Sequence, residues 1–379
     1  MTPTSKHSEI SSHLEMEIAA GKYRDGARLP SEIQLVQQFG VSRPTVARAF
    51  RELEKKGLIE RRAGSGTYMR MSPQRSTTAR ILGLLVPGLA STEIFQIICG
   101  EIASLARVNE YGLLWGGSAN PHVDTDTSWT HAEEICKQFI ERKVSGVFFA
   151  PAELQPGQQR ANIRLAESLR EAGIPVLLID RDLLSFPERS DFDLVGIDNV
   201  AAGSMVAEHL IKLGCRKLFF VARPLSAPTV NARIAGIREA MVRNHIEPDP
   251  DWVKSGDPSE LKFFRSLVAG RQADAFICAN DDTAAVLLRA LESQGLRVPR
   301  DARVVGFDDV KYATLVSTPL TTIHQPCRDI AAIAFRSMLE RLAEPTLPTR
   351  SINLPPRLVV RESCGAYLPR PKEITGKRR

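Results

Sequence analysis

Short apolar runs alternate with amphipathic segments over most of the chain, from residue 81 to about residue 309. Runs such as ILGLLVP (81–87) and IPVLLID (174–180) are typical of strands buried on both faces of a parallel sheet. Segments such as FQIICGEIASLARV (95–108) lie between them and carry apolar residues at helical spacing. This alternation predicts a doubly wound α/β architecture with parallel sheets. The other predicted strands are 111–117, 144–151, 193–198, 216–222, 273–280 and 302–309, and the other predicted helices are 201–214, 231–244 and 282–295.

A different pattern occupies residues 29–69, LPSEIQLVQQFGVSRPTVARAFRELEKKGLIERRAGSGTYM. Apolar residues spaced by three and four predict two short helices separated by a turn at Gly40. Ser31 and Ser42 stand at the expected N-caps, and Pro44 falls in the first turn of the second helix, where proline is tolerated. Leu35, Val36 and Phe39 share one face of the first helix, and Val46, Phe50 and Leu53 form the predicted buried stripe of the second.

Basic residues lie on the opposite face of the second helix and in the segment that follows it. Beyond Gly57, two short strands are expected to flank a glycine-containing tip at residues 61–67. The order helix, turn, helix, hairpin predicts a winged helix-turn-helix. In that fold the second helix enters the DNA major groove and the hairpin reaches the adjacent minor groove. The helix face carries Arg43, Thr45, Arg48 and Arg51.

Charge supports this interpretation, because the basic excess is confined to one end of the chain. The 379 residues carry 50 Lys+Arg and 44 Asp+Glu, a net charge of +6. Residues 1–80 hold 14 basic and 8 acidic side chains, so the remaining residues are balanced at 36 of each. A localised positive field favours attraction to phosphate groups of duplex DNA.

Composition restricts the remaining possibilities. No apolar run reaches the length of a membrane span, and MTPTSKHSEI at the start lacks a signal-peptide core. The six cysteines are scattered without close pairs, which disfavours a zinc site or a disulfide framework and suits a reducing cytoplasm. Polar residues 72–80 predict a linker, and residues 367–379 a basic tail. The predicted domains are therefore 1–71 and 81–366.

Motifs for enzymatic chemistry are missing from the sequence. It contains no G-x-G-x-x-G at the first helix, no phosphate-binding P-loop, no G-x-S-x-G and no H-E-x-x-H. The adjacent acidic pairs Asp281/Asp282 and Asp308/Asp309 point in diverging directions, so helix capping and strand-end hydrogen bonding are the expected roles. We expect no catalytic residue, no cofactor and no metal site, and hence a protein that is not an enzyme.

The first 71 residues resemble the winged helix-turn-helix of GntR-family transcription regulators, through LPSE, VSRPTV, ELEKKGLI and GSGTY. The family commonly has arginine where this chain has Ile33 and Ala47, so the operator sequence cannot be carried over. The resemblance implies that the DNA-binding residues are Ser31, Glu32, Ser42, Arg43, Pro44, Thr45, Arg48, Arg62, Gly64, Ser65, Gly66 and Thr67.

Residues 81–366 resemble the effector domain of LacI/GalR-type repressors, which has the periplasmic-binding-protein fold. The matching segments include IPVLLIDRDL, ARIAGIREAM, FICANDDTAAVLLRALESQGLRVPRDARVVGFDD and PLTTIHQP. The order of head and body resembles the arabinose-repressor branch of the GntR regulators. The resemblance implies two lobes joined by crossovers near Ile197, Ile323 and Pro355, with a small molecule between them. Lobe 1 would comprise about 81–197 and 323–354, and lobe 2 about 198–322 and 355–366.

By position in these motifs, the expected effector contacts are Phe95, Arg233, Asn280 and Asp308. Arginine, asparagine and aspartate together can both donate to and accept from sugar hydroxyls. Phe95 and Trp115 could supply a stacking face, with core packing as the alternative for each. Cys327 stands where relatives often place an aromatic residue.

Together these features predict a cytoplasmic, homodimeric, DNA-binding transcription regulator, most simply a repressor. Its partners would be double-stranded operator DNA and a small-molecule effector, a sugar or sugar derivative. Three alternatives stay open: a constitutive DNA-binding regulator with a vestigial cleft, a solute-binding protein, and a sugar-processing enzyme. The effector, the operator, the regulated genes and the sign of regulation are not determined by the sequence.

Overall fold

The computed structural model describes residues 6–19, 22–23, 26–62, 65–69, 80–86, 93–116, 125–271 and 273–368. Two compact units divide the chain, Met1–Ala79 and Arg80–Arg379. The predicted linker at 72–80 lies outside the described residues except for Arg80, and so does the predicted tail beyond residue 368.

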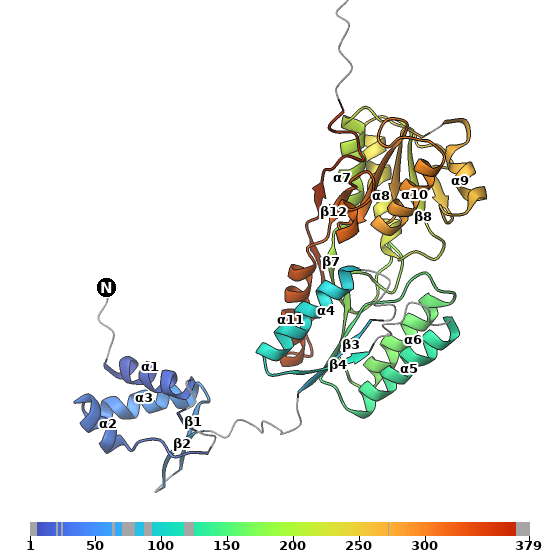
Figure 1. Cartoon of the computed structure of the whole chain (residues 1–379). Coiled ribbons are helices and arrows are strands. Elements are labelled where there is room, and N and C mark those ends of the chain that lie inside the picture. The colour runs from blue at the N-terminus through green and yellow to red at the C-terminus, as the bar shows by residue number, and fades with distance from the viewer. Residues whose placement is uncertain are drawn as a thin grey trace, which may run out of the picture. The chain divides into compact units, whose positions relative to one another are not determined.

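The first unit contains three helices followed by a β-hairpin. The helices are α1 (Lys6–Ala19), α2 (Glu32–Phe39) and α3 (Arg43–Lys55), and the strands are β1 (Ile59–Arg62) and β2 (Gly66–Met69). The predicted helix-turn-helix and hairpin are thereby confirmed (Figure 1). Ser31 caps α2 in a reciprocal capping box with Gln34, and Gly40 ends it with φ near 61°. Val46, Phe50 and Leu53 are fully buried, as their spacing predicted.

Two six-stranded sheets form the frame of the second unit. The first has the order β13-β7-β6-β5-β3-β4 and the second β14-β12-β11-β10-β8-β9. All neighbouring strands in them are parallel except β12 and β14, which are antiparallel. The strands are β3 (Ile81–Leu85), β4 (Gly112–Gly116), β5 (Gly146–Phe149), β6 (Val176–Ile179), β7 (Asp193–Ile197), β8 (Leu218–Ala222), β9 (Val253–Ser255), β10 (Ala275–Cys278), β11 (Arg303–Asp308), β12 (Thr321–His324), β13 (Ser351–Leu354) and β14 (Arg357–Val359).

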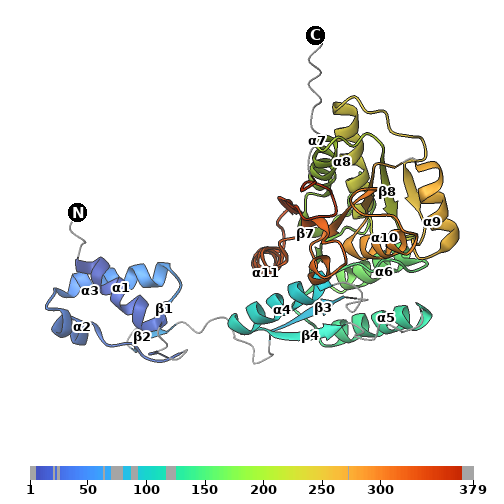
Figure 2. The same ribbon diagram turned by 45° about the horizontal axis from the view of Figure 1, so that its top comes forward.

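Helices cover both faces of each sheet, which is why their strands are so apolar. On the first sheet, α4 and α5 lie on opposite sides of β3 and β4 (Figure 2), and α11 packs beside α4. On the second sheet, α7 packs against α8, and α10 lies on β10 and β11. The helices are α4 (Glu93–Val108), α5 (Thr125–Glu141), α6 (Gln158–Glu171), α7 (Asn199–Lys212), α8 (Thr229–Arg243), α9 (Leu261–Val268), α10 (Asp281–Ser293) and α11 (Cys327–Ala343), with short 3-10 turns at Ala269–Arg271 and Lys311–Thr314.

The chain passes three times between the two sheets. It leaves the first sheet after β7, returns after β12 into α11, and crosses again between β13 and β14. We call the part built on the first sheet lobe 1 and the part built on the second sheet lobe 2. These passages place Ile197, His324 and the Pro355-Pro356 pair at the junction of the lobes.

Each of the eight predicted strands and four predicted helices of this unit is present, with ends shifted by a few residues. The prediction that each strand is buried on both faces is wrong for β4. That strand is at the edge of its sheet and pairs only with β3, so Trp115 is 42% exposed. The predicted parallel sheets are present, and β14 is the one strand among those described that pairs antiparallel within them. The chain turns back from lobe 1 at Pro355 and enters lobe 2 beside β12 in the opposite direction.

Candidate DNA-binding and ligand-binding sites

The start of α3 presents the predicted DNA-binding residues on the surface of the first unit. Ser42, Arg43, Pro44 and Arg48 are exposed, and Thr45 is half-buried. Ser42 occupies the N-cap position, but its hydroxyl bonds the Thr45 hydroxyl at 2.8 Å and caps no backbone N–H. Pro44 has no N–H, and the Thr45 N–H donates to the Ser42 carbonyl at 3.0 Å, so the side chains of this helix start, rather than its backbone N–H groups, are what α3 offers to DNA.

Glu32 joins the recognition helix to the hairpin. Its carboxylate lies 2.9 Å from Nε of Arg43 and also pairs with Nη2 of Arg61 on β1. Because the contact to Arg43 uses only Nε, the outer edge of that guanidinium remains directed away from Glu32. The sequence placed Arg61 in the basic tip of the hairpin, whereas the structure places it on β1. Its pairing with Glu32 was not predicted, because the two residues are far apart along the chain.

The hairpin places some of its predicted contact residues differently from expectation. Ser65 is exposed and bonds the Tyr68 hydroxyl at 2.7 Å, whereas Gly64 lies outside the described residues. Thr67 is only 8% exposed, and its carbonyl accepts a hydrogen bond from the Leu29 N–H. The Thr67 side chain is therefore largely covered by the protein, and an approach of Thr67 to DNA stays a prediction.

Gly66 pairs with Arg62 across the hairpin and has φ of 129°, a backbone conformation that favours glycine. A Cβ atom at this position would lie 2.9 Å from Nε of Arg28. For Arg62 the structure describes the backbone and not the side chain. Gly66 thus has a structural role in seating Arg28 against the hairpin.

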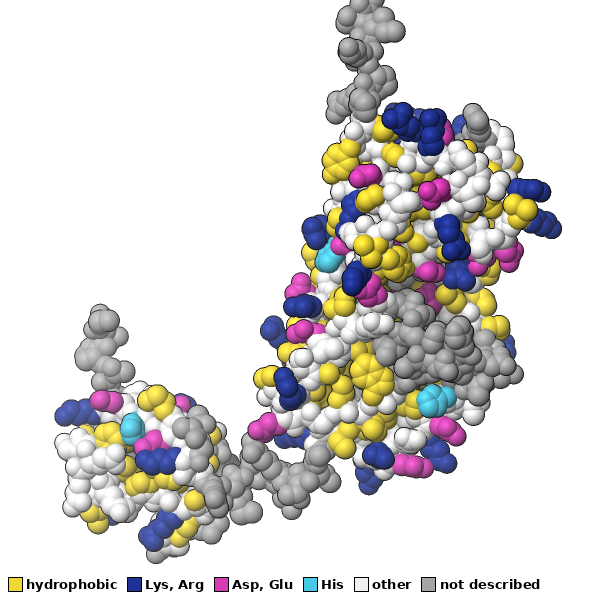
Figure 3. Space-filling model, viewed as in Figure 1, with side chains coloured by type: hydrophobic (Ala, Val, Ile, Leu, Met, Phe, Trp, Pro, Cys, Tyr) yellow, Lys and Arg dark blue, Asp and Glu magenta, His cyan; other side chains and the backbone are white. Residues whose placement is uncertain are grey.

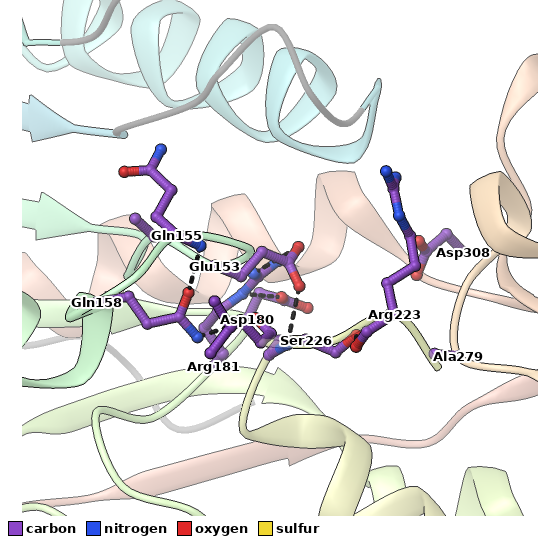
Figure 4. Close-up of polar contacts among 12 residues, drawn as sticks. Glu153, Gln155, Gln158, Asp180, Arg181, Arg223, Ser226, Ala279 and Asp308 are labelled. Atoms are coloured by element: carbon purple, nitrogen blue, oxygen red, sulfur yellow. Dashed lines mark hydrogen bonds and ion pairs between the residues drawn. The ribbon is translucent and has the colours of Figure 1, made fainter. Parts of the chain in front are cut away.

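A pocket lies between the two lobes of the second unit, at the carboxyl ends of their strands. Lobe 1 contributes Ile94, Glu153, Asp180 and Arg181. Lobe 2 and its junction with lobe 1 contribute Arg233, Asn280, Asp308, Gln325 and the backbone around Ser226, Ala227 and Ala279. Figure 4 shows the carboxylate and guanidinium groups of Glu153, Asp180 and Arg181 gathered where loops of the two lobes meet. We call this the interlobe pocket.

On the lobe 1 side, Arg181 is held between two carboxylates. Its Nη1 lies 2.7 Å from Oε1 of Glu153, and its Nε donates to Oδ2 of Asp180 at 3.0 Å. The guanidinium also lies over the Phe95 ring, 5.1 Å from its centroid. Phe95 is buried and is not among the residues that line the interlobe pocket. The face of its ring beside Arg181 is covered by that guanidinium and is not open to a ligand.

On the lobe 2 side, Arg233 is bound by the protein itself. Its Nε donates to Oδ1 of Asn199 at 2.8 Å, and its Nη1 donates to the Ala279 carbonyl. The guanidinium lies 4.4 Å from the Phe307 ring centroid and 4.0 Å from Oδ1 of Asp308. The structure therefore brings Arg233 and Asp308 together, as the sequence led us to expect.

The side chains of Asn280 and Asp308 also accept hydrogen bonds from other groups of the protein. The Asn280 side chain caps α10 by accepting from the Thr283 N–H at 2.9 Å. Asp308 ends β11 at φ of 113° and accepts from the Gln325 amide at 2.8 Å. Burial raises the pKa of Asp308 to about 7, opposed by Arg233 and reinforced by Asp180 and Glu153.

Two buried oxygen atoms of the interlobe pocket have no hydrogen-bond partner within the described part of the chain, Oδ1 of Asp180 and Oε1 of Gln325. Both residues are nearly inaccessible to solvent. A buried acceptor without a donor is costly, so a molecule in this pocket gains stability by donating hydrogen bonds to these atoms.

The lobes contact each other directly on both sides of the interlobe pocket. Glu153 accepts from the Ala227 N–H at 2.9 Å, and the Leu154 N–H donates to the Leu225 carbonyl at 2.8 Å. At another point, Glu93 of α4 accepts from the Lys311 N–H at 2.8 Å. These bonds define a closed arrangement in which the pocket is small.

Sequence reasoning missed several residues of the interlobe pocket, namely Glu153, Asp180, Arg181 and Gln325. Asp180 was noticed as a strand end, and Gln325 lies inside the TTIHQP segment, so both carried a usable signal. No sequence motif marked Glu153, because the loop that follows β5 has no distinctive pattern. Trp115 lies on β4 and does not line the interlobe pocket, and Cys327 is buried at the start of α11.

The surface of the second unit carries both signs of charge. On the face seen in Figure 3, Lys and Arg side chains are interleaved with Asp and Glu over this unit. This agrees with the balanced composition beyond residue 80. Among the described residues, no helix is both long enough and apolar enough to cross a membrane.

Two family models match separate parts of the chain. Residues 6–69 match the model for bacterial regulatory proteins of the gntR family, and residues 207–364 match the model for a periplasmic-binding-protein-like domain. The chain is 26% identical over 371 residues to the arabinose metabolism transcriptional repressor of Geobacillus stearothermophilus, covering 94% of this chain and 97% of the repressor.

Two solved structures show the same fold. A complex of the transcriptional regulator CelR with cellobiose has a TM-score of 0.63 and 22% identity, over 85% of this chain and 91% of the other. The lac repressor dimer bound to operator and the anti-inducer ONPF has a TM-score of 0.60 and 23% identity, over 77% of this chain and 95% of the repressor chain. At these identities the likeness concerns the architecture of the molecule.

Proposed function

From a chain that combines a GntR-family helix-turn-helix domain with a periplasmic-binding-protein-like domain, we propose a transcriptional repressor whose affinity for operator DNA is switched by a small molecule. One observation carries the proposal. The same chain holds an exposed, arginine-bearing helix start and a buried polar pocket lined by two lobes. The Geobacillus relative is a transcriptional repressor, which supports a regulatory role over an enzymatic one.

The DNA-binding surface of this proposal is the start of α3 with the adjacent hairpin. Arg43, Thr45 and Arg48 would enter the major groove, and Ser65 with its neighbours would approach the backbone beside it. Ser31 and Glu32 act within the protein in this structure, through the cap of α2 and the pairing with Arg43. A homodimer would present two such surfaces to a pseudo-palindromic operator in the cytoplasm. The dimeric, operator-bound lac repressor has the same fold as lobes 1 and 2 and supports this arrangement.

The effector would bind in the interlobe pocket and contact Arg233, Asn280 and Asp308. The names of the relatives favour a sugar or sugar derivative, since one regulates arabinose metabolism and another was solved with cellobiose. Binding changes operator affinity only if the effector prefers one arrangement of the lobes over the other. A tenfold preference corresponds to about 1.4 kcal/mol of coupling.

The experiment is to select binding sites from random duplex DNA with the full-length protein and then to measure affinity by fluorescence anisotropy. We expect an inverted-repeat site bound with strong salt dependence. An effector should then change the measured affinity when added at saturating concentration. Failure to enrich any sequence would overturn the assignment of the first unit as a specific DNA reader.

A second candidate is a constitutive DNA-binding regulator that takes no effector. One observation favours it: Arg181 and the contacts between the lobes already satisfy most of the polar groups of the interlobe pocket. A thermal-shift screen with sugars, sugar phosphates and purines separates the two candidates, because a ligand stabilises the protein by mass action. No response across such a panel would favour the constitutive regulator.

A further inference from the structure

Carboxylates outnumber guanidinium groups in the interlobe pocket. Glu153, Asp180 and Asp308 face only Arg181 and Arg233 among the charged residues that line it. A neighbouring pocket shares Asp180 and adds more carboxylates than cations, through Asp182, Glu188 and Asp198 against Arg189. Above about pH 7, where Asp308 is ionised, the carboxylates between the lobes therefore outnumber the cations, and a site of this kind favours a positively charged ligand.

Two further observations are independent of the charge count. Oδ1 of Asp180 and Oε1 of Gln325 are buried acceptors that receive no hydrogen bond from any described residue, and both residues line the interlobe pocket. The two arginines cannot readily supply those donors. Arg181 is engaged by Glu153 and Asp180, and Arg233 by Asn199 and the Ala279 carbonyl. A ligand that enters the pocket can supply the missing donors.

We propose that the effector of this protein carries a protonated amine on a hydroxylated framework, as an amino sugar does. The inference rests on the proposed function, because it presumes that the interlobe pocket is the effector site. The ammonium group would donate to Asp180 and Asp308, and neighbouring hydroxyls would donate to Gln325. Ligands that bear a carboxylate or phosphate are disfavoured, because they would add negative charge to the excess already present.

Binding of such a cation is coupled to loss of a proton from Asp308. With a pKa near 7, this carboxyl holds its proton in slightly acidic solution, which lowers the negative charge of the empty pocket. An ammonium group supplies the positive charge that the carboxylate needs, so the proton leaves to solvent when the cation enters. The charged and titratable groups around Asp308 include its neighbour Asp309 and, from the elements packed against it, Arg233 of α8, Asp180 after β6, Glu153 after β5, Asp281 of α10, His324 of β12, Cys327 of α11 and Tyr312 of the Lys311–Thr314 turn.

The test uses full-length protein with EDTA and matched sugars that differ in one group. The probes are D-glucosamine and D-galactosamine, their neutral parents D-glucose and D-galactose, D-glucuronate, and D-glucose 6-phosphate. Thermal shift and titration calorimetry at pH 7.5 measure binding. We expect an amino sugar to bind at least about tenfold more tightly than its neutral parent, as expected for a desolvated charge contact. Its affinity should rise about tenfold per pH unit from pH 5 and level off near pH 7.

Two variants and one control locate the effect. Asp180→Asn keeps the size of the side chain but removes its charge, and should weaken binding of the amino sugar about tenfold more than it weakens binding of the neutral parent. Asp308→Asn should abolish the pH dependence of binding. Glu171→Gln, an exposed carboxylate at the end of α6, should change neither quantity.

The outcomes separate this inference from the function on which it rests. Equal or tighter binding of a neutral or anionic member of the panel, with a change in operator affinity, overturns the amine and leaves the ligand-switched repressor standing. Silence of the matched panel, together with silence of the broad panel of sugars, sugar phosphates and purines, overturns both. Amino-sugar affinity that is independent of pH removes Asp308 as the coupled group and contradicts the inference.

Discussion

Arg43 of the first unit and Arg181 of the second show how solvent changes the role of the same ion pair. The two guanidinium groups lie at similar distances from carboxylates, 2.9 Å from Glu32 and 2.7 Å from Glu153. The Arg43 side chain is 71% exposed, whereas that of Arg181 is 4% exposed. The exposed pair contributes little to stability and can exchange water for DNA. The buried arginine is held by two carboxylates that would otherwise be buried without a cation beside them.

The largest expected effect comes from removing the buried arginine. Arg181→Ala leaves Glu153 and Asp180 buried without their cation, so we expect a loss of about 3–5 kcal/mol in the free energy of unfolding of the second unit. Urea denaturation followed by tryptophan fluorescence measures this loss. Arg160→Ala, at an exposed position on α6, is the matched control and should stay within about 0.5 kcal/mol of the parent protein. A loss below about 1 kcal/mol for Arg181→Ala would contradict the contrast between the buried and the exposed arginine.

The next effect concerns pH. Asp308 has a pKa raised to about 7 in the folded protein, so the folded state holds this proton more tightly than the unfolded chain. Stability is therefore lost as pH rises from about 4 to 7, at up to about 1.4 kcal/mol per pH unit, and changes little above that range. Asp308→Asn removes this dependence, so its stability relative to the parent protein should increase over that interval. Asp281 also has a raised pKa, through burial and through the neighbouring Asp308 carboxylate, so Asp308→Asn lowers the pKa of Asp281 as well and changes the difference in the same direction.

That comparison is made by thermal denaturation at pH 5 and pH 8 in buffers of equal ionic strength. Two parallel stability curves, with no pH-dependent difference between Asp308→Asn and the parent protein, would show that Asp308 is ionised throughout.

A smaller effect on binding is expected at the exposed arginine, and it should occur without loss of stability. Arg43→Ala should weaken operator binding by about 1–3 kcal/mol, the range of a good major-groove contact. Its free energy of unfolding should change by less than about 0.5 kcal/mol, because the pair with Glu32 is exposed to solvent. Fluorescence anisotropy with the selected operator measures the first quantity. Full operator affinity in Arg43→Ala would remove α3 from the role of recognition helix.

The smallest effect tests whether Glu32 positions Arg43. Glu32→Gln weakens the hold on Arg43, so the arginine must be ordered when DNA binds, at a cost of about 0.5–1 kcal/mol. Loss of a negative charge by itself would favour DNA, and Glu54→Gln on the exposed side of α3 measures that electrostatic gain. We expect Glu32→Gln to bind the operator more weakly than Glu54→Gln with the same salt dependence. Equal affinities would show that Glu32 has no positioning role.

The sequence was most informative where a structural feature depends on neighbours along the chain. Ser31, Gly40 and the Val46-Phe50-Leu53 stripe predicted the two helices of the first unit, since caps and helical periodicity are local properties. The apolar runs predicted the strands of both lobes for the same reason. They did not show that β4 is an edge strand or that β14 runs antiparallel, because these features depend on which strands come together.

For the candidate sites too, the sequence identified residues that belong to local motifs, whereas the fold decided which side chains are exposed. Local motifs pointed to Arg43, Arg233, Asn280 and Asp308, and the structure places the last three in the lining of one pocket. Thr67 and Ser65 stood side by side among the predicted contacts, but the Thr67 side chain is buried whereas Ser65 is exposed.

By itself the sequence determined a basic winged helix-turn-helix followed by an α/β unit, because capping, periodicity and charge balance are readable residue by residue. The division of that unit into two lobes was implied by the resemblance to LacI/GalR-type repressors. Only the tertiary structure decided which charged side chains form ion pairs with one another. It joined Glu32 to both Arg43 and Arg61, placed Arg181 between Glu153 and Asp180, and left two buried acceptors without donors among the described residues. Ion pairing and burial depend on distances between segments remote in the chain, and the fold alone sets those distances.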